Sequence, residues 1–326
     1  MRTHAGKSHR YATSGEVCRW FATSHGCYDV HSAATRIAEG LLDATRQAEP
    51  PIELGSIARL RCVTKTVYKS DIKTLGTLQR VNDGFLILLQ RDLHWFARRE
   101  FWAHEIAHTF FYDIDARPPK RLLSTKGREE EFICELLARE ILIPRTQLSD
   151  ALRGEDPSLA SLIGLSKRFK TTISTMANRV IGDLRSWATI LILCEQREHL
   201  FPYSRVVRRP GRLLRVVRCI APNTKEAFVP INKIVEKTPI IAEAFAQRRY
   251  VEGWVEFDKF GSLHGEKWVQ TLPTASGSGV IALIHLGWTF PSPSTAKPRQ
   301  ATSDLLPIRA PGNASFFPQE PSRKLS

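Results

Sequence analysis

Residues 101–113 read FWAHEIAHTFFYD, an apolar stretch that carries two histidines and a glutamate. The neighbours of His104, Glu105 and His108 are almost all apolar, so a helix formed here would lie in a protein core. Burying two imidazoles and a carboxylate costs free energy unless these groups have a partner. The chain must therefore fold so that this polar trio is compensated, and no other feature of the sequence restricts the fold as strongly.

The spacing of His104 and His108 predicts that the partner is a metal ion. Side chains four residues apart lie on nearly the same face of a helix, so both imidazoles can reach one ion. Imidazole nitrogen suits zinc, and manganese is the alternative ion. Glu105 lies beside the two histidines, where its carboxylate could accept a proton from a water acidified by the cation. The competing interpretation is a helix with two surface histidines.

A third ligand is expected from another segment, because a catalytic zinc usually has three protein ligands and one open position. The helix predicted over residues 128–142, REEEFICELLAREIL, offers Glu131 on one face with the small residues Cys134 and Ala138. Small residues allow two helices to approach closely. Glu135, one turn further, is the rival ligand.

The sequence constrains the roles of the other polar residues near the motif less strongly. Glu129 and Glu130 are expected to point into solvent. Cys134 could be a thiolate ligand, although a small packed side chain is the plainer interpretation. Tyr112, one turn after His108, is the candidate donor to the oxyanion of a tetrahedral intermediate, with a structural tyrosine as the plainer alternative.

Around the motif, the hydrophobic pattern predicts a mixture of helices and strands. Helices are expected at 33–48 and in LGSIARLRC, and strands in TKTVYKS, GTLQRV and GFLILLQ. The turn Asn82–Asp83–Gly84 joins the last two strands as a hairpin, because these residues tolerate positive φ. A long helical stretch then continues to Tyr112.

The pattern also divides the chain into parts. We expect a basic flexible leader at 1–31, a metal-binding core at 32–150, a helical segment at 151–186, a β-rich domain at 187–290 and a disordered tail at 291–326. The β-rich domain includes the strand patterns of WATILILCE, RLLRVVRCI, YVEGWVEF and SGVIALIHL.

The helical segment contains LSKRFKTTISTMANRVIG, which has the spacing of a helix-turn-helix. Its expected core consists of Phe169, Ile173, Met176 and Val180. The side chains available for phosphate contacts are Lys167, Arg168, Lys170 and Arg179. A small helical subdomain packed on the core is the plainer interpretation of the same pattern.

Charge and cysteine use place the protein in a broad class. The 326 residues include 47 Lys and Arg against 33 Asp and Glu, a net charge of +14, which favours acidic partners and predicts weak nucleic-acid binding through a basic surface. Six scattered cysteines without a C-x-x-C pair predict a reducing, cytoplasmic location. The basic N-terminus has no apolar segment of a secretory signal, and no apolar run is long enough to span a membrane.

Two stretches resemble the ImmA/IrrE family of metallopeptidases. The first is AHEIAHTFFYD, and the second is EFICELLAREILIP, which is similar to the family pattern E-x-x-A/C-x-x-F-A-x-x-L-L-x-P. Aligned on Pro144, the family glutamate falls on Glu131, which the resemblance therefore implies as the third ligand beside His104 and His108. The resemblance extends over roughly residues 33–195.

The chain also departs from the family pattern. Glu100 and Phe101 stand where R-F-T is common, Leu137 replaces the usual Phe, and Tyr112 stands where many members have a further His. None of these departures affects a ligand, and together they indicate a divergent branch.

The resemblance implies an α+β fold with a zincin-like metallopeptidase core, in which a small sheet supports the H-E-x-x-H helix. It also implies a helix-turn-helix-like segment after the core, and a sensory role for the β-rich domain by analogy only. Members cleave regulatory proteins, so the expected partner is a protein substrate such as a helix-turn-helix repressor or an antitoxin.

Two alternatives to a regulatory zinc endopeptidase remain. One is a DNA-binding transcriptional regulator that keeps a structural or sensing metal site, motivated by the helix-turn-helix pattern. The other is a zinc hydrolase acting on a small substrate, which the basic charge and the separate C-terminal domain make less attractive.

Overall fold

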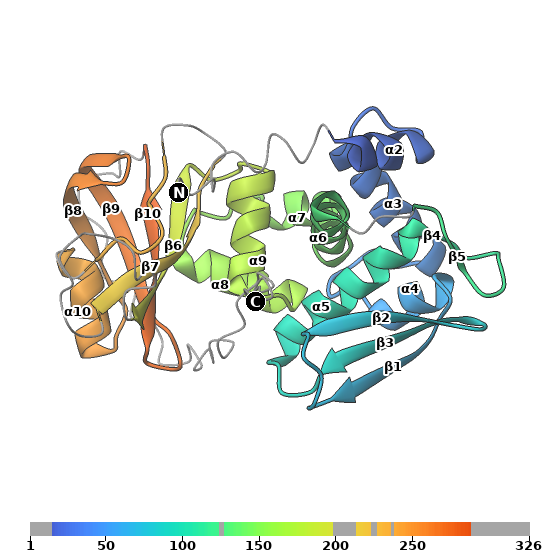
Figure 1. The fold of residues 1–326 in the computed structure, drawn as a ribbon. Coiled ribbons are helices and arrows are strands. Elements are labelled where there is room, and N and C mark those ends of the chain that lie inside the picture. Colours follow the sequence, from blue (N-terminus) through green and yellow to red (C-terminus); the bar gives the residue numbers. More distant parts are fainter. Residues whose placement is uncertain (1–14, 124–126, 198–212, 223–226, 236–237, 288–326) are drawn as a thin grey trace, which may run out of the picture.

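The fold was analysed in a computed structural model that describes residues 15–123, 127–197, 213–222, 227–235 and 238–287. It is a mixed α+β structure with three parts in a row (Figure 1). A three-stranded sheet with helices lies at one end, a group of helices lies in the middle, and a five-stranded sheet lies at the other end. The predicted tail at 291–326 lies outside the described residues.

The smaller sheet supports the helix that carries the histidine motif. Its strands are β1 (Val63–Lys69), β2 (Gly76–Val81) and β3 (Gly84–Gln90), in the order β1-β3-β2. β1 and β3 are parallel, whereas β2 and β3 form the predicted hairpin, with Val81 opposite Gly84. Helix α5 (Trp95–His108) packs on this sheet.

Helix α5 is shorter than the sequence predicts. It ends at His108 and continues as a single 3-10 turn, η1 (Thr109–Phe111). Tyr112 then begins the short strand β4 (Tyr112–Asp113), which pairs with β5 (Lys120–Arg121). The prediction of a helix through Tyr112 is therefore wrong by one turn.

Four further helices surround α5, namely α2 (Glu16–Ser24), α3 (Val30–Thr45), α4 (Leu54–Leu60) and α6 (Arg128–Leu142). α6 lies against both α5 and α3. The presence of α2 corrects the prediction of a flexible leader over 1–31, because Cys18 and Phe21 of this helix are buried in the main core. The Phe21 ring stacks on Phe111 at a centroid distance of 5.6 Å. Residues 1–14 lie outside the described part of the chain.

The middle helices are α7 (Arg145–Ala151), α8 (Leu159–Phe169), α9 (Ile173–Ala177) and the π-helical turn η2 (Asn178–Asp183). The residues predicted as the core of this segment are buried, namely Phe169, Ile173, Met176 and Val180. Arg179 is also buried, with 2% exposure, and its guanidinium pairs with Glu140 and donates to the carbonyl of Ile143 at 3.1 Å. The prediction that Arg179 is available for phosphate contacts is therefore wrong.

The C-terminal sheet is antiparallel, with the strand order β7-β6-β10-β9-β8. Its strands are β6 (Thr189–Arg197), β7 (Leu213–Ile220), β8 (Val251–Phe260), β9 (Leu263–Pro273) and β10 (Gly279–His285). β9 and the helix α10 (Pro239–Gln247) were not predicted. Successive residues of β10 pack into two different hydrophobic cores. Leu283 packs into the main core, which the other helices form, and Ile284 packs into a second core, which includes residues of α10.

None of the described helices is both long enough and apolar enough to cross a membrane.

Candidate metal centre

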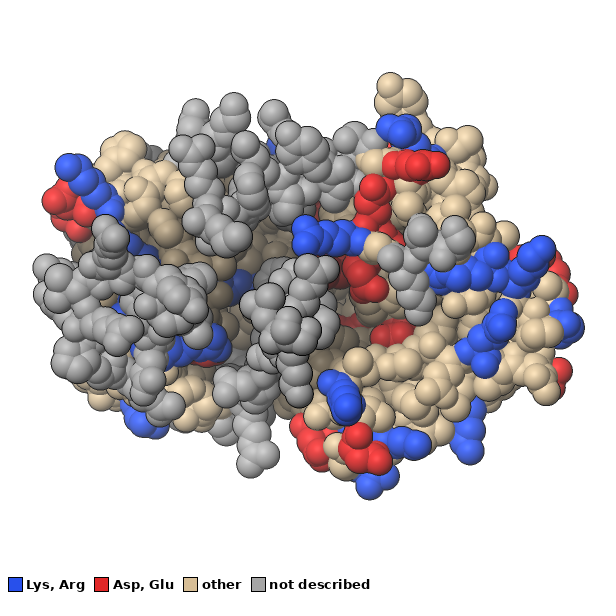
Figure 2. Space-filling model, viewed as in Figure 1, with Lys and Arg blue, Asp and Glu red and all other residues tan. Residues whose placement is uncertain are grey.

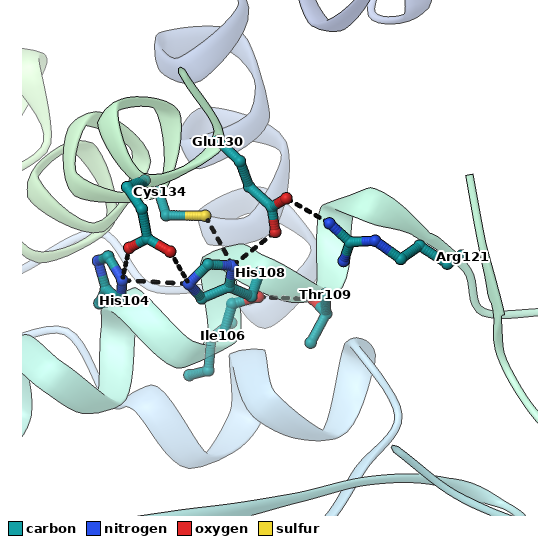
Figure 3. A network of polar contacts seen from close by, with 8 residues as sticks. His104, Ile106, His108, Thr109, Arg121, Glu130 and Cys134 are labelled. Carbon is teal, nitrogen blue, oxygen red and sulfur yellow. Dashed lines mark hydrogen bonds and ion pairs between the residues drawn. The ribbon is translucent and has the colours of Figure 1, made fainter. Parts of the chain in front are cut away.

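Helix α5 brings His104 and His108 together on one face, as their spacing predicts. Their Nε2 atoms are 3.2 Å apart, and their rings meet edge to face with centroids 4.9 Å apart. Both side chains lie near the C-terminal end of α5, on the side that faces α6 (Figure 3). The local fold therefore brings two of the three predicted ligands together.

Glu131, in the first turn of α6, brings a carboxylate to the two imidazoles. One carboxylate oxygen lies 3.3 Å from Nε2 of His104, and the other lies 3.7 Å from Nε2 of His108. Zinc–ligand bonds of about 2.1 Å in a tetrahedral arrangement place neighbouring ligand atoms about 3.4 Å apart. The Nε2–Nε2 separation and the shorter carboxylate separation match that value, and one ligand atom from each of the three residues lies within 4.8 Å of the others, so these residues could hold a metal ion.

The rival residues take other positions. Glu135 is exposed, and among the described residues the ligand group contains Glu131 instead. Cys134 is fully buried, and its Sγ lies 3.3 Å from Nδ1 of His108, on the side of the ring away from Nε2. Burial raises the pKa of the Cys134 thiol. Cys134 therefore contacts His108 on the Nδ1 side of the ring and packs between α5 and α6.

Glu130 has a role that the sequence analysis missed. It is 1% exposed, its carboxylate lies 2.9 Å from Nδ1 of His108, and its other oxygen pairs with Arg121 (Figure 3). The prediction that Glu130 points into solvent is wrong. An ionised carboxylate can only accept, so Nδ1 of His108 donates to Glu130, and Nε2 is the ring nitrogen that faces His104 and Glu131.

The charge state of Glu130 follows from the same contacts. Burial would raise its pKa, but the hydrogen bonds from His108 and Arg121 outweigh burial and lower the pKa. The ionised carboxylate can therefore orient the ligand. A signal was available in the sequence, because metal-bound histidines commonly have a carboxylate behind them. The sequence alone did not select among three consecutive glutamates.

Glu129 is also engaged, and its prediction as a solvated residue is wrong as well. Its carboxylate accepts hydrogen bonds from the backbone N–H groups of Val17 at 2.9 Å and Cys18 at 3.1 Å. It thus caps the N-terminus of α2, where Gly15 has no side chain of its own to do so. The three successive glutamates of α6 therefore have three different partners. Glu129 contacts α2, Glu130 contacts Nδ1 of His108, and Glu131 contacts the Nε2 atoms of the two histidines.

Glu105, the predicted general base, lies buried against β2. It is 6% exposed, and burial raises its pKa. The carboxylate accepts a backbone hydrogen bond from Leu78 of β2 and lies against Gly76 of the same strand. A Cβ at Gly76 would come within 2.8 Å of a Glu105 carboxylate oxygen, so this glycine leaves room for the side chain.

Tyr112 lies beside the site in other contacts. Its ring packs edge-on against Phe85 with centroids 5.1 Å apart, and the guanidinium of Arg121 lies 5.3 Å from the ring centroid. These contacts connect Tyr112 to β3 and to the residue that holds Glu130. The structure therefore gives Tyr112 a packing role, and a role as oxyanion donor stays a prediction.

The carboxylates around the two histidines stabilise positive charge at this site. Burial lowers the pKa of His104, but the neighbouring carboxylates, led by Glu131, outweigh it and raise the pKa. Figure 2 shows Asp and Glu side chains across the middle of this face, in the region that α5 and α6 occupy in Figure 1. A divalent cation would satisfy the same field, so the donor set and the charge both fit a metal.

Comparison with known proteins adds little to this picture. No protein-family model and no curated protein matches the chain. The structure is similar to that of a Mycobacterium tuberculosis transcriptional regulator, with a TM-score of 0.45 and 14% identity over 82% of this chain and 92% of that one. A likeness at that level does not bear on function.

Proposed function

We propose that this chain is a zinc-dependent endopeptidase with His104, His108 and Glu131 as ligands and Glu105 as the general base. The observation that carries the proposal is the spacing of the three ligand groups, 3.2, 3.3 and 3.7 Å, beside a buried carboxylate. The motif and α6 also resemble the ImmA/IrrE pattern, which supports membership of that family.

The chemistry would be divided between the ion and the protein. A zinc ion at this site would polarise a peptide carbonyl and acidify water. Glu105 would accept the proton of the attacking water and later deliver it to the leaving amine. Burial, which raises the pKa of Glu105, makes the protonated form accessible for that second transfer. Glu130 would keep His108 in the tautomer that binds the metal.

An extended peptide fits the surroundings better than a small substrate. β2 is an edge strand of its sheet and lies directly beside the Glu105 carboxylate, with the Leu78 N–H pointing toward it. An edge strand can pair with an incoming chain through backbone hydrogen bonds. This arrangement supports a protein substrate held along β2, with its scissile bond near the ligands.

The biological setting is part of the same proposal. By resemblance, the substrate is a helix-turn-helix repressor or an antitoxin, and cleavage is limited and regulatory. All six cysteines are free, which supports a reducing, cytoplasmic environment. The second function considered, a DNA-binding regulator, loses one of its phosphate contacts because Arg179 is buried against Glu140.

The decisive experiment is the variant Glu105→Gln, assayed with a co-expressed repressor encoded next to this gene. We expect zinc content to stay at the wild-type level and cleavage to fall by about 100- to 10,000-fold, the usual range for loss of a general base. Glu135→Gln, one turn from the ligand, is the matched control and should cleave normally. Full activity of Glu105→Gln would remove the catalytic assignment. Retained zinc without cleavage in the wild type would instead favour a structural or sensing metal.

A further inference from the structure

The N-terminal end of α5 has a surface that the proposed peptidase does not use. Trp95, the first residue of the helix, is 42% exposed, and Tyr68 near the end of β1 is 37% exposed. Basic side chains from separate segments surround these two rings. We name this set the aromatic–basic surface, and its members are Tyr68, Arg91, Trp95, Arg98, Arg99 and Lys170.

The cations contact the aromatic rings directly. The guanidinium of Arg98 lies 5.0 Å from the Tyr68 ring centroid, and Arg91 donates to the backbone carbonyl of Tyr68 at 3.2 Å. Lys170, in the turn between α8 and α9, has its Nζ atom 5.3 Å from the Trp95 ring centroid. Arg99 approaches the same ring at 5.7 Å. Tertiary packing thus gathers four cations from three parts of the chain.

These four cations make no ion pair among the described residues, although the charges of Glu53 and Glu100 act on Arg99 from beyond ion-pair distance. Among the described residues, none of Arg91, Arg98, Arg99 and Lys170 has a carboxylate oxygen within 4.0 Å, although eleven such ion pairs occur elsewhere in the structure. The exposed Asp92 follows Arg91 in the chain without pairing with it. Gathering like charges is unfavourable unless an anion offsets their repulsion.

We propose that the aromatic–basic surface binds single-stranded nucleic acid. Sites of this kind combine aromatic side chains, on which bases stack, with cations that follow the phosphate backbone. Both components are present here. The exposed Lys167 adds a further cation near Lys170 in the chain, whereas Arg168 is paired with Glu49 at 3.9 Å, and the net charge of +14 favours the encounter.

Single strands fit this surface better than the alternatives. A duplex keeps its base faces stacked inside, so exposed tryptophan and tyrosine rings would gain nothing from it. An anionic membrane would interact with the cations, but two aromatic residues that are less than half exposed provide little apolar area for insertion. Binding to single strands uses both the rings and the charges.

The surface is separate from the metal centre. Trp95 and His104 are nine residues apart on one helix, which corresponds to about 14 Å. The inference therefore does not depend on the proposed peptidase activity. It also involves no residue of the site, and the Glu105→Gln variant should bind nucleic acid as the wild type does.

The test is fluorescence anisotropy of the full chain with a labelled oligonucleotide of about 12 nucleotides, within the range of single-strand site sizes. We expect binding that weakens with salt and a loss of about tenfold or more for Trp95→Ala. Trp95→Phe should keep most of the affinity, because it preserves a stacking face. Lys170→Ala should weaken binding and reduce the salt slope by about one.

The controls use matched residues on the far sheet. Trp254 of β8 is exposed to 39%, close to Trp95, and Lys259 of the same strand is an exposed lysine. Trp254→Ala and Lys259→Ala should leave affinity unchanged, and thermal melts should confirm that every variant is folded. Three results would overturn the inference. They are equal losses in the two tryptophan variants, tighter binding to a duplex than to the single strand, and binding to phosphatidylserine vesicles without binding to the oligonucleotide.

Discussion

The ionisable side chains at the two ends of α5 differ in whether a carboxylate lies close to them. At the C-terminal end, His104 and His108 each have a carboxylate oxygen within 3.7 Å, and the acid behind His108 is itself paired with Arg121. At the N-terminal end, four cations surround two exposed rings, and no carboxylate among the described residues lies within 4.0 Å of them. One helix therefore carries an acidic, internally paired site and a basic, unpaired surface.

The difference shows which charges serve the fold and which are available to a ligand. Buried charges are tolerated when paired, as Glu130 is with Arg121 and Arg179 is with Glu140. Among the cations at the other end of α5, Arg91 and Arg99 donate hydrogen bonds to the backbone carbonyls of Tyr68 and Ile52, but none forms an ion pair with a carboxylate of the described residues. The Glu130–Arg121 pair holds His108 at the candidate metal centre, whereas, by our proposal, the cations at the other end of α5 interact with an anionic partner.

The largest effect is expected at the metal ligand on α6. Glu131→Ala removes one of three ligands, so zinc affinity should fall by well over the roughly 100-fold that loss of an outer partner can cause. Isothermal titration with zinc would measure it. Glu135→Ala, on the same face one turn later, should bind zinc normally. The reverse outcome would make Glu135 the ligand. A loss of oligonucleotide binding in Glu131→Ala would show that the two ends of α5 are coupled.

The next effect concerns the residue behind His108. Glu130→Ala removes the acceptor that fixes the His108 tautomer, so zinc affinity should fall by about 10- to 100-fold. Arg121 would also lose its partner. Thermal melts in the presence of excess zinc would separate a loss of folding from a loss of affinity. An unchanged zinc affinity in a folded Glu130→Ala protein would contradict the orienting role.

A smaller effect is expected where β2 meets the general base. Gly76→Ala would place a Cβ 2.8 Å from a Glu105 carboxylate oxygen, so that side chain must move. We expect cleavage to fall by about tenfold, within the range for a disturbed general base, while zinc affinity stays unchanged. Gly40→Ala is the control, because a Cβ there meets nothing within 4 Å. A matching loss of zinc would mean that Gly76 acts on the ligands instead.

The smallest effect concerns the link between α2 and α6. In Gly15→Ala the new Cβ would clash with the Glu129 carboxylate and displace this cap from the N-terminus of α2. Loss of a cap costs about 1 kcal/mol of unfolding free energy. Chemical denaturation would measure the change. A Gly15→Ser variant, which supplies its own capping hydroxyl, should recover much of the loss, and equal destabilisation by both would argue against the cap.

The metal-binding face of α5 was predictable because it depends on short-range geometry. The interval between His104 and His108 sets their common face, and the apolar flanks show that this helix is buried. The hairpin at Asn82–Asp83 was predictable for the same reason, since turn residues and strand patterns are local. Glu131 was assigned from helix periodicity together with the family resemblance.

The partners of the neighbouring charges were not predictable in this way. Glu129, Glu130 and Glu131 are consecutive and chemically identical, and only the positions of α2, α5 and β5 decide what each one binds. Arg179 was predicted from the helix-turn-helix spacing alone, but in η2 its guanidinium pairs with Glu140 of α6. Helix α2 escaped prediction because it is short, and because the partner of its Phe21 ring, Phe111, lies far away in the chain.

The sequence by itself determined that two histidines and a glutamate share a buried helix, because residue spacing and hydrophobicity act within a single element. Tertiary structure alone decided which of three glutamates faces the histidines, which holds His108 from behind, and which cations gather at the other end of α5. These outcomes depend on side chains from segments far apart in the chain, and their distances are set by packing between elements and not by their order in the sequence.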